Sequence, residues 1–530
     1  MASGKTGKKT WFARKLREWS IAFCENMTNL PEHKFGQFSS SLLSDEDVAG
    51  AIHLHLQGLG KWVSANQIAR YVRTPEFQAR LRVKRNISVR TAQRWMKKMG
   101  YRWKKEPKGM YSDGHERADV VNYRQNVFLP QWRDYEASAR HWQADASFEE
   151  VDHECRMRLF MSDNLDCRPY TIWRQDESIF YANDRRTTRW VHESETAKIR
   201  AKGEGASDMI GDFVSPEYGW LRSKRLNVRG EFDDARVLLK PGKKREGYQT
   251  TETILAQVTR AMNILDRDYT EDRHVFAYDN ATIHTARAPD ALSALGMTLG
   301  PSNNFNKSNG VYVHMRDATF RDGSAQVLYQ ANGTTFKGLK VLIQERRAKG
   351  HDLPDPDSIN PITKKKYLVQ CGGSGAFKCR TTMDTKCCLR KMMYSEPDFK
   401  NQMSILEEHC QKRGYGVLFF PKFHPELNFI EQCWGYAKRI YRMYPESTSE
   451  DDLRANLLDA VASVPIESMR RFATRSSRFG DAYFRGLNGA EAAWANKKYR
   501  GHRTLPPSYE EDLREAKTKW PAWKLGPTQK

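Results

Sequence analysis

Three acidic residues that lie far apart in the sequence each stand at the end of a predicted apolar element. Asp176 follows the run "TIWRQ", Asp279 follows "VFAY", and Glu431 opens a predicted helix. A single aspartate after a strand usually forms a turn, so the set is more informative than any one member. Phosphodiester cleavage and strand transfer need an activated oxygen nucleophile and a stabilised leaving oxyanion. Two Mg²⁺ or Mn²⁺ ions about 3.5–4 Å apart can supply both, so the set predicts a metal-dependent site acting on phosphodiesters.

The stretch around Glu431, "FHPELNFIEQCWGYAKR" (423–439), has two interpretations. Asn428 is a good helix N-cap, and a glutamate three residues later completes a capping box. The polar face of the same predicted helix carries, one turn apart, Glu431, Gly435, Lys438 and Arg442. On this face a carboxylate is followed by a small residue and then by two basic residues. Such an arrangement suits a site where a metal ion held by the carboxylate lies beside a phosphate backbone. On this second interpretation Lys438 and Arg442 contact the nucleic acid.

The charge of the chain points to an anionic partner. Over 530 residues the net charge is +22, and the isoelectric point is about 9.5. Residues 61–110 hold 15 Lys and Arg against 2 Glu, so the charge is concentrated rather than spread. No amphipathic anchor accompanies this charge, and no apolar run reaches the ~18 residues that a membrane helix needs. Composition therefore favours a nucleic acid over a membrane surface.

Two basic helices are predicted near the N-terminus. The stretches "SANQIARYV" (64–72) and "SVRTAQRWMKKMGY" (88–101) each begin at a serine N-cap. The second helix buries a face made of Val89, Ala92, Met96 and Met99. The basic side chains that lie away from that face are Arg90, Arg94, Lys97 and Lys98. This pattern is typical of a helix-turn-helix recognition helix against DNA, and the alternative is a solvated surface helix.

The chain divides into three predicted regions. Residues 1–140 form the basic, all-α helix-turn-helix region. Residues 141–445 alternate predicted strands and helices, so the middle is an α/β domain. It carries a loop-rich, cysteine-containing insertion at about 300–395. Residues 446–530 form a helical and basic C-terminal tail.

The nine cysteines are thinly spread and then clustered, which favours a reducing compartment over a disulfide framework. The segment "QCGGSGAFKCRTTMDTKCC" contains Cys371, Cys379, Cys387 and Cys388. Thiolates this close can bind Zn²⁺, although the spacing is not that of a standard CxxC pair. The alternative is a set of buried thiols that pack as small apolar groups.

Three motifs resemble those of mariner-like DDE transposases, in particular the long forms of fungal genomes. They are "QDESIFYAND", "YDNATIH" and "FHPELNFIEQCWG", and they occur in the family's order. The resemblance extends from the helix near residue 64 to the tail. It implies a ribonuclease-H-like catalytic domain, two Mg²⁺ or Mn²⁺ ions held by Asp176, Asp279 and Glu431, and cut-and-paste transposition of DNA.

The chain departs from the family's pattern in two places. Phe429 replaces the usual proline, which is a mild change. Between Asp279 and Glu431 lie 151 residues, where the family has only a few tens. A sizeable insertion therefore sits in the catalytic domain. Because long surface insertions cost little free energy, the fold is expected to remain intact.

The first acidic residue and a nearby histidine each have alternatives. Asp163, Asp166 and Asp184 lie near Asp176. Asp176 is preferred because it directly follows the best apolar run and matches the family's motif. His284, in "YDNATIH", either touches a phosphate or positions water, or it satisfies a loop carbonyl.

The leading hypothesis is a nuclear DNA transposase that binds terminal inverted repeats in double-stranded DNA as a homodimer. It would cut there and join the ends to new DNA, and the resemblance suggests a TA target. One alternative is a domesticated, sequence-specific DNA-binding protein without cleavage activity, against which the complete Asp/Asp/Glu set argues. Another is a retroviral-type integrase, which would carry an N-terminal His/Cys zinc unit that the sequence lacks.

Overall fold

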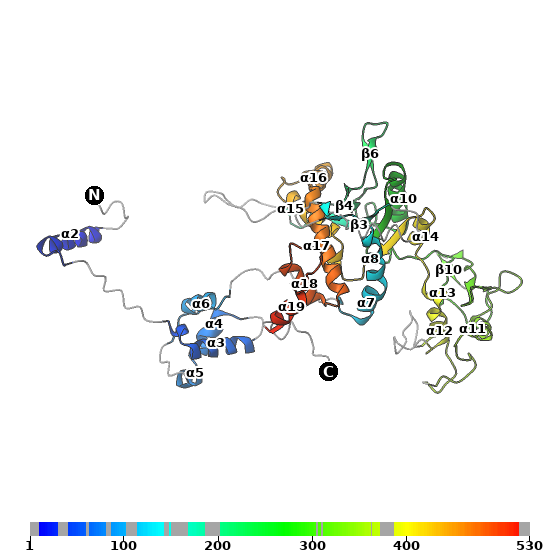
Figure 1. The fold of residues 1–530 in the computed structure, drawn as a ribbon, viewed down its shortest axis with the longest axis horizontal. Coiled ribbons are helices and arrows are strands. Elements are labelled where there is room, and N and C mark those ends of the chain that lie inside the picture. The colour runs from blue at the N-terminus through cyan, green and yellow to red at the C-terminus, as the bar shows by residue number, and fades with distance from the viewer. Residues whose placement is uncertain are drawn as a thin grey trace. The chain divides into compact units, whose positions relative to one another are not determined.

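Figure 1 shows the computed structural model of the chain. It describes residues 10–29, 41–59, 63–80, 86–101, 114–142, 148–149, 168–185, 202–303, 306–308, 311–361, 363–371 and 386–518. The chain separates into two compact units, Met1–Gly109 and Met110–Lys530. Each unit has hydrophobic cores of its own.

The described part of the first unit is helical. Its elements are α2 (Thr10–Glu25), the 3₁₀ helix η1 (Leu42–Ser44), α3 (Glu46–Gly58), α4 (Ala65–Tyr71), α5 (Pro75–Arg80) and α6 (Val89–Lys98). At the start of α4 the Ser64 amide donates to the Gln67 side chain (2.6 Å). At the start of α6 the Thr91 amide donates to the Ser88 hydroxyl (3.1 Å). Both helices predicted from the sequence are therefore present, with the predicted serine caps.

The buried face of α6 differs from the predicted one. Ala92 and Trp95 are buried in the core that α6 shares with α4, whereas Val89 is 39% exposed. Met96 and Met99 pack against that core from its edge. Trp95 therefore takes part in the buried face in place of Val89. The exposed side chains of the helix include Arg90, Arg94, Lys97 and Lys98.

The second unit is built on a mixed six-stranded sheet. Its strands are β3 (Tyr170–Tyr181), β4 (Ser207–Ser215), β5 (Gly219–Trp220), β8 (Val237–Leu239), β9 (Arg273–Tyr278) and β14 (Gly416–Phe419). The order is β14-β9-β3-β4-β5, and β8 also pairs with β4. Strand β9 runs parallel to both β3 and β14, and β4 runs antiparallel to β3. These are the order and directions of the ribonuclease-H-like fold, so the predicted α/β fold class is confirmed.

Helices cover both faces of this sheet. Successive residues of a strand point to opposite sides, so the strands present apolar side chains to both layers of helices. On β9, Phe276 and Tyr278 pack toward one face, and Val275 and Ala277 pack toward the other. The first face is covered by α10 (Thr251–Asp268) and α14 (Ile405–Gln411). The second is covered by α8 (Leu129–Ala137), α15 (Ile430–Tyr441), α16 (Glu450–Ala462) and α17 (Ile466–Phe484).

The C-terminal helices share a core with the segment that precedes the sheet. This core joins Phe128, Leu129 and Trp132 to side chains of the last two helices. The elements concerned are α7 (Ala118–Tyr123), the π-helix η2 (Arg124–Phe128), α18 (Gly489–Lys498) and α19 (Tyr509–Thr518). The boundary between the two units therefore follows Gly109, whereas the first predicted region extended to residue 140.

The segment between β9 and α14 folds around a core of its own. That core runs from Leu292 to Phe399 and includes Phe336 and Ile343. Its elements are β10 (Lys307–Ser308), β11 (Val311–Tyr312), β12 (Ala318–Thr319), β13 (Ala325–Gln326), α11 (Leu339–Ala348), α12 (Leu389–Ser395) and α13 (Pro397–Lys400). This subdomain corresponds to the loop-rich insertion placed at about 300–395, and we call it the insertion below.

Two further hairpins lie outside the main sheet. They are β1 (His141–Trp142) with β2 (Phe148–Glu149), and β6 (Arg222–Leu226) with β7 (Phe232–Asp234). Among the described residues, no helix is long and apolar enough to cross a membrane.

Gly480, on α17, offers a direct test of this packing. A Cβ atom added there would lie 1.5 Å from Trp132 Cζ3, inside the buried ring. We expect Gly480→Ala to lower the free energy of unfolding by about 1–3 kcal/mol or more, because the core is overpacked. Gly435→Ala on α15, where the added Cβ meets no atom within 4 Å, is the matched control. It should raise that free energy by up to about 1 kcal/mol. Equal denaturation midpoints for both variants in urea would show that α17 and α8 do not pack in this way.

Candidate active site

The pairing of β3 with β9 sets two acidic residues side by side. Arg174 on β3 is in register with Ala277 on β9 in a parallel ladder. Two residues further along each chain, Asp176 and Asp279 are therefore level, on strands about 4.8 Å apart. Strand β9 ends before Asp279, whereas β3 continues beyond Asp176 because it still pairs with β4. The prediction that Asp176 ends its strand was therefore wrong.

Glu431 comes from the first turn of α15. Phe429 occupies the N-cap position of this helix, and no side chain caps it. The Asn428 side chain instead donates a hydrogen bond to the Gln175 carbonyl on β3 (3.3 Å). The predicted capping box is therefore wrong. Asn428 ties the start of α15 to the strand that carries Asp176.

The three acidic residues line one cavity of about 280 Å³. Part of its wall is formed by residues 420–425, which connect β14 to the 3₁₀ helix η3 (Pro425–Leu427). Within this wall Phe423 has a φ of 64°, a conformation that bulky side chains rarely adopt. Strain of this kind persists only where surrounding contacts hold the loop.

The acidic side chains of the cavity act on one another's pKa. Burial raises the pKa of Asp176 well above its usual range, and the negative charge of Glu431 adds to the effect. Burial also raises the pKa of Glu431, with the positive charge of Lys438 opposing it and the charge of Asp279 adding to it. The Trp434 indole N–H donates to Asp176 Oδ2 (3.1 Å). Carboxylates that disfavour one another's charge favour a bound cation, and an all-oxygen donor set suits Mg²⁺ or Mn²⁺.

A buried histidine holds Asp279. His284 Nδ1 lies 2.6 Å from Asp279 Oδ1, and its Nε2 lies 3.7 Å from Glu177 Oε1. Burial acts to lower the pKa of His284, but the interactions with Asp279 and Glu177 outweigh it and raise that pKa to about 9. The imidazole is therefore positively charged at neutral pH and orients the Asp279 carboxylate. Its Nδ1 also lies 3.3 Å from the Asp279 carbonyl, which matches the loop-carbonyl role considered from the sequence.

A network of polar side chains around the buried His115 holds the strained wall of the cavity. His115 Nδ1 lies 2.7 Å from Glu116 Oε1. Its Nε2 lies 3.1 Å from Glu426 Oε1 and 3.0 Å from the Tyr483 hydroxyl. The His115 ring stacks on that of His424, which itself lines the cavity (centroids 3.8 Å apart). The wall is thus tied to the segment before α7 and to α17.

Arg124 completes this network. Its guanidinium donates to His424 Nε2 (2.9 Å), and His424 Nδ1 donates to the Lys422 carbonyl (2.8 Å). We refer to the following residues as the clasp: His115, Glu116, Arg124, His424, Glu426 and Tyr483. Ligand atoms of two histidines and Glu426 lie within 4.8 Å of one another, as in a metal site. Hydrogen bonds already occupy those atoms, so the clasp acts as a structural network.

The pKa values of the two histidines of the clasp are shifted in opposite directions. Burial acts to lower the pKa of His115, but hydrogen bonds to Glu116 and Glu426 outweigh it and raise that pKa to about 9. Burial, together with the positive charge of His115, lowers the pKa of His424 to about 4. At neutral pH, His115 is therefore the charged member and His424 the neutral acceptor of the Arg124 hydrogen bond. No local sequence pattern reveals the clasp, because its members lie up to 368 residues apart.

The basic residues predicted on α15 lie along the same helix as Glu431. Lys438 Nζ is 5.4 Å from the centre of the Phe180 ring. Arg442 is exposed and forms an ion pair with Asp184 (2.8 Å). Asp184, one alternative for the first acidic residue, is not among the described residues that line the cavity. The other two alternatives, Asp163 and Asp166, lie outside the described residues.

Three of the four cysteines predicted to bind zinc lie together in the insertion. The Sγ atoms of Cys371, Cys387 and Cys388 are all within 4.8 Å of one another. Cys388 is fully buried, and the other two are half-buried. Cys379 lies outside the described residues.

Neither the protein-family models nor the curated proteins include a match to this chain. Among solved structures, the chain is similar to the Mos1 transposase paired-end complex with left transposon end. The two share 11% identity over 89% of this chain and 87% of that one, with a TM-score of 0.42. The Mos1 mariner paired-end complex with Mn is 12% identical over 88% of this chain and 86% of that one, with a TM-score of 0.42. The Mos1 strand transfer complex is 10% identical over 89% of this chain and 86% of that one, with a TM-score of 0.41. Identity this low does not transfer an activity, so function rests on the chain's own site.

The clasp makes the stability of the second unit depend on pH. Because folding raises the pKa of His115 from 6.5 to about 9, the stabilisation from its ionic hydrogen bonds is complete below pH 6.5, declines above it and is lost as the pH rises through 9. We expect His115→Gln to cost about 1.5–3 kcal/mol of unfolding free energy at about pH 6, and much less at about pH 10. The groups that contact His115 are Glu116, His424, Glu426 and Tyr483. His502→Gln is the control: His502 is exposed, so its replacement should not lower the free energy of unfolding in this pH-dependent way. Thermal unfolding at both pH values measures this, and a pH-independent cost for His115→Gln would contradict it.

Proposed function

We propose that this protein is a DNA transposase of the mariner-like kind, cutting at the ends of its own element and joining them to target DNA. The observation that carries the proposal is the meeting of Asp176, Asp279 and Glu431 in one cavity of a ribonuclease-H-like sheet. Hydrolysis and strand transfer both require a phosphodiester to be bound beside hard-cation ligands. Three carboxylates from separate elements, with few competing side chains, meet that requirement.

Asp176, Asp279 and Glu431 are the residues that would hold the Mg²⁺ or Mn²⁺ ions. When bound, such ions supply Lewis-acid stabilisation of the attacking and leaving oxygens. The chain's own contribution is orientation. His284 fixes the Asp279 carboxylate, and the Trp434 indole fixes Asp176. The clasp holds the wall that the DNA backbone would meet.

DNA recognition is assigned to the first unit and to α15. On α6 the basic side chains are exposed together on the side away from the buried Ala92 and Trp95, which supports a recognition helix. Lys438 and Arg442 continue from Glu431 along α15 and would contact phosphates near the cavity. We also propose that the protein acts as a homodimer on the paired ends of its element, in the nucleus, and that it joins them to DNA at a TA dinucleotide.

The second candidate is a DNA-binding regulator that no longer cleaves. It would use the same α6 helix but would not need ordered carboxylates. The hydrogen bonds that orient Asp176 and Asp279 favour the catalytic alternative, because a silent site has no need of them.

Neutral isosteres of the acidic residues separate cleavage from binding. We expect Asp279→Asn and Glu431→Gln each to lower nicking of terminal-repeat DNA by at least about 100-fold, because each removes an anionic ligand. Affinity for the same DNA should be unchanged, since the basic helices are untouched. Nicking of a labelled duplex in Mg²⁺, together with a mobility-shift titration, measures both quantities. Undiminished nicking by either variant would remove the catalytic assignment.

The first acidic residue is tested by a matched pair. Asp176→Asn should abolish nicking, whereas Asp184→Asn should retain it, because Asp184 pairs with Arg442 instead of lining the cavity. The reverse result would transfer the role to Asp184.

The α6 side chains are expected to divide into base readers and phosphate binders. Arg90 and Arg94 lie toward the N-terminal end of the helix, and an arginine paired with guanine gives about 1–3 kcal/mol of discrimination. Changing either to Ala should therefore flatten the preference for terminal-repeat over random DNA. Changing Lys97 and Lys98 to Ala should weaken binding to both DNAs and reduce the salt slope by roughly one per lost contact. Fluorescence anisotropy at several salt concentrations distinguishes the two classes. An unchanged preference in Arg94→Ala would reduce α6 to a non-specific basic clamp.

A further inference from the structure

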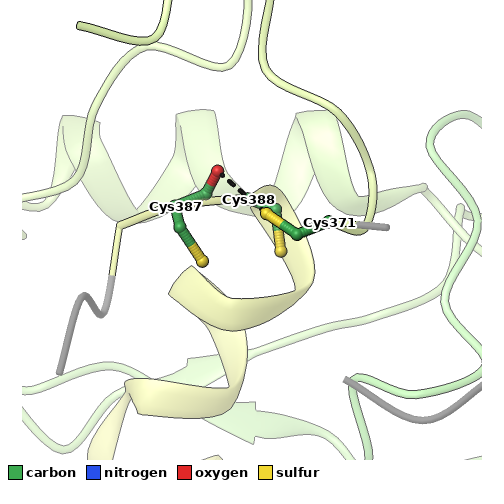
Figure 2. A group of neighbouring side chains, drawn as sticks. All are labelled: Cys371, Cys387 and Cys388. Atoms are coloured by element: carbon green, nitrogen blue, oxygen red, sulfur yellow. Dashed lines mark hydrogen bonds between the residues drawn. The ribbon is translucent and has the colours of Figure 1, made fainter. Parts of the chain in front are cut away.

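Three cysteine sulfurs converge in the insertion, as Figure 2 shows. The Sγ atoms of Cys371, Cys387 and Cys388 all lie within 4.8 Å of one another. Two thiolates on a tetrahedral zinc, with Zn–S near 2.3 Å, lie about 3.8 Å apart. Small side-chain rotations would therefore close the three sulfurs on one ion. We propose that these cysteines hold a structural Zn²⁺ ion, separate from the acidic cavity.

Backbone contacts bring the three sulfurs together. The Leu389 amide donates to the Leu368 carbonyl (3.1 Å), and the Arg390 amide donates to the Val369 carbonyl (3.0 Å). These bonds hold the segment before Cys371 against the first turn of α12, which follows directly on Cys388. The site is thus preorganised by the fold of the insertion, which lowers the entropic cost of binding an ion.

Two more hydrogen bonds order the cysteines themselves. The Asn360 side chain donates to the Cys387 carbonyl (2.9 Å). The Cys371 thiol points at the same carbonyl (3.5 Å), the contact drawn dashed in Figure 2. The first bond fixes the backbone at Cys387, and the second orients the Cys371 side chain toward Cys387.

Packing as small apolar groups accounts for only one of the three cysteines. Cys388 is completely buried, as a core thiol would be. Cys371 and Cys387 are only half-buried. Half-exposed thiols held against a buried one are poorly explained by core packing and well explained by a shared ligand.

A bound ion would tie together parts of the insertion that have little regular structure. The described strands of the insertion have only 2 residues each, α12 and α13 have 7 and 4, and α11 has 10. Small loop-rich modules with sparse regular structure commonly use a metal as a staple. Soft thiolates select zinc over the hard cations that suit the carboxylate cavity, so the two sites would not compete for one ion.

Zinc content of the full-length protein tests the proposal. The chain purified with Zn²⁺ and then desalted should hold about one zinc per chain, measured by elemental mass spectrometry. Cys371→Ser and Cys387→Ser should each reduce this to less than about one tenth, because each removes a thiolate ligand. Two controls should retain the ion: Cys24→Ser, which removes an exposed thiol of the first unit, and Asp279→Asn, which alters the acidic cavity.

A second measurement keeps the test valid where a variant folds poorly. Wild-type protein stripped with EDTA and loaded with Co²⁺ should show thiolate-to-cobalt charge-transfer absorption, and Zn²⁺ should abolish it. EDTA should also lower the thermal midpoint of both wild type and Asp279→Asn, and added Zn²⁺ should restore it. Absence of the cobalt band in wild type would overturn the proposal. So would zinc retained by Cys371→Ser and Cys387→Ser at the level of the controls.

Discussion

The parallel ladder between β3 and β9 is the constraint on which the candidate site depends. It makes Asp176 level with Asp279, and it keeps two carboxylates close despite their mutual repulsion. A slip of one residue would turn Asp176 to the opposite face of the sheet, so the register is strongly specified by the apolar residues around it. Trp173 and Phe276, a registered pair on the same ladder, are both fully buried. The cores on the two sides of the sheet therefore secure the position of the acids.

Glu431 lies far from these two residues in the sequence, and the packing of α15 on the sheet brings it beside them. Trp434, one turn further along α15, stacks on Trp220 (centroids 4.9 Å apart) and donates to Asp176. Asn428 links the start of the same helix to β3. The clasp then fixes the loop between β14 and α15 through His424. The result is a cavity with few acidic groups, two of them oriented by hydrogen bonds, in a chain whose overall charge is strongly positive.

The long insertion is compatible with this arrangement because its two ends meet. The Ile405 amide, where α14 begins, donates to the Ala286 carbonyl shortly after Asp279 (2.8 Å). Strands β9 and β14 are neighbours in the sheet, so the chain leaves and returns at one edge. The insertion buries its own apolar residues, and the sheet between the acidic residues is left uninterrupted. Its length therefore costs the site little.

The sequence by itself determined the features that depend on short-range patterns. Alternating apolar runs predicted an α/β domain, the serine caps predicted α4 and α6, and the motif order singled out Asp176, Asp279 and Glu431. Only the tertiary structure decided which contacts those residues make. Strand β3 extends past Asp176 because β4 pairs with it, and Asn428 turns to Gln175 instead of capping α15. The clasp and the packing of Trp95 likewise join residues whose distance in sequence exceeds any local period. Local propensity carries no information about such contacts.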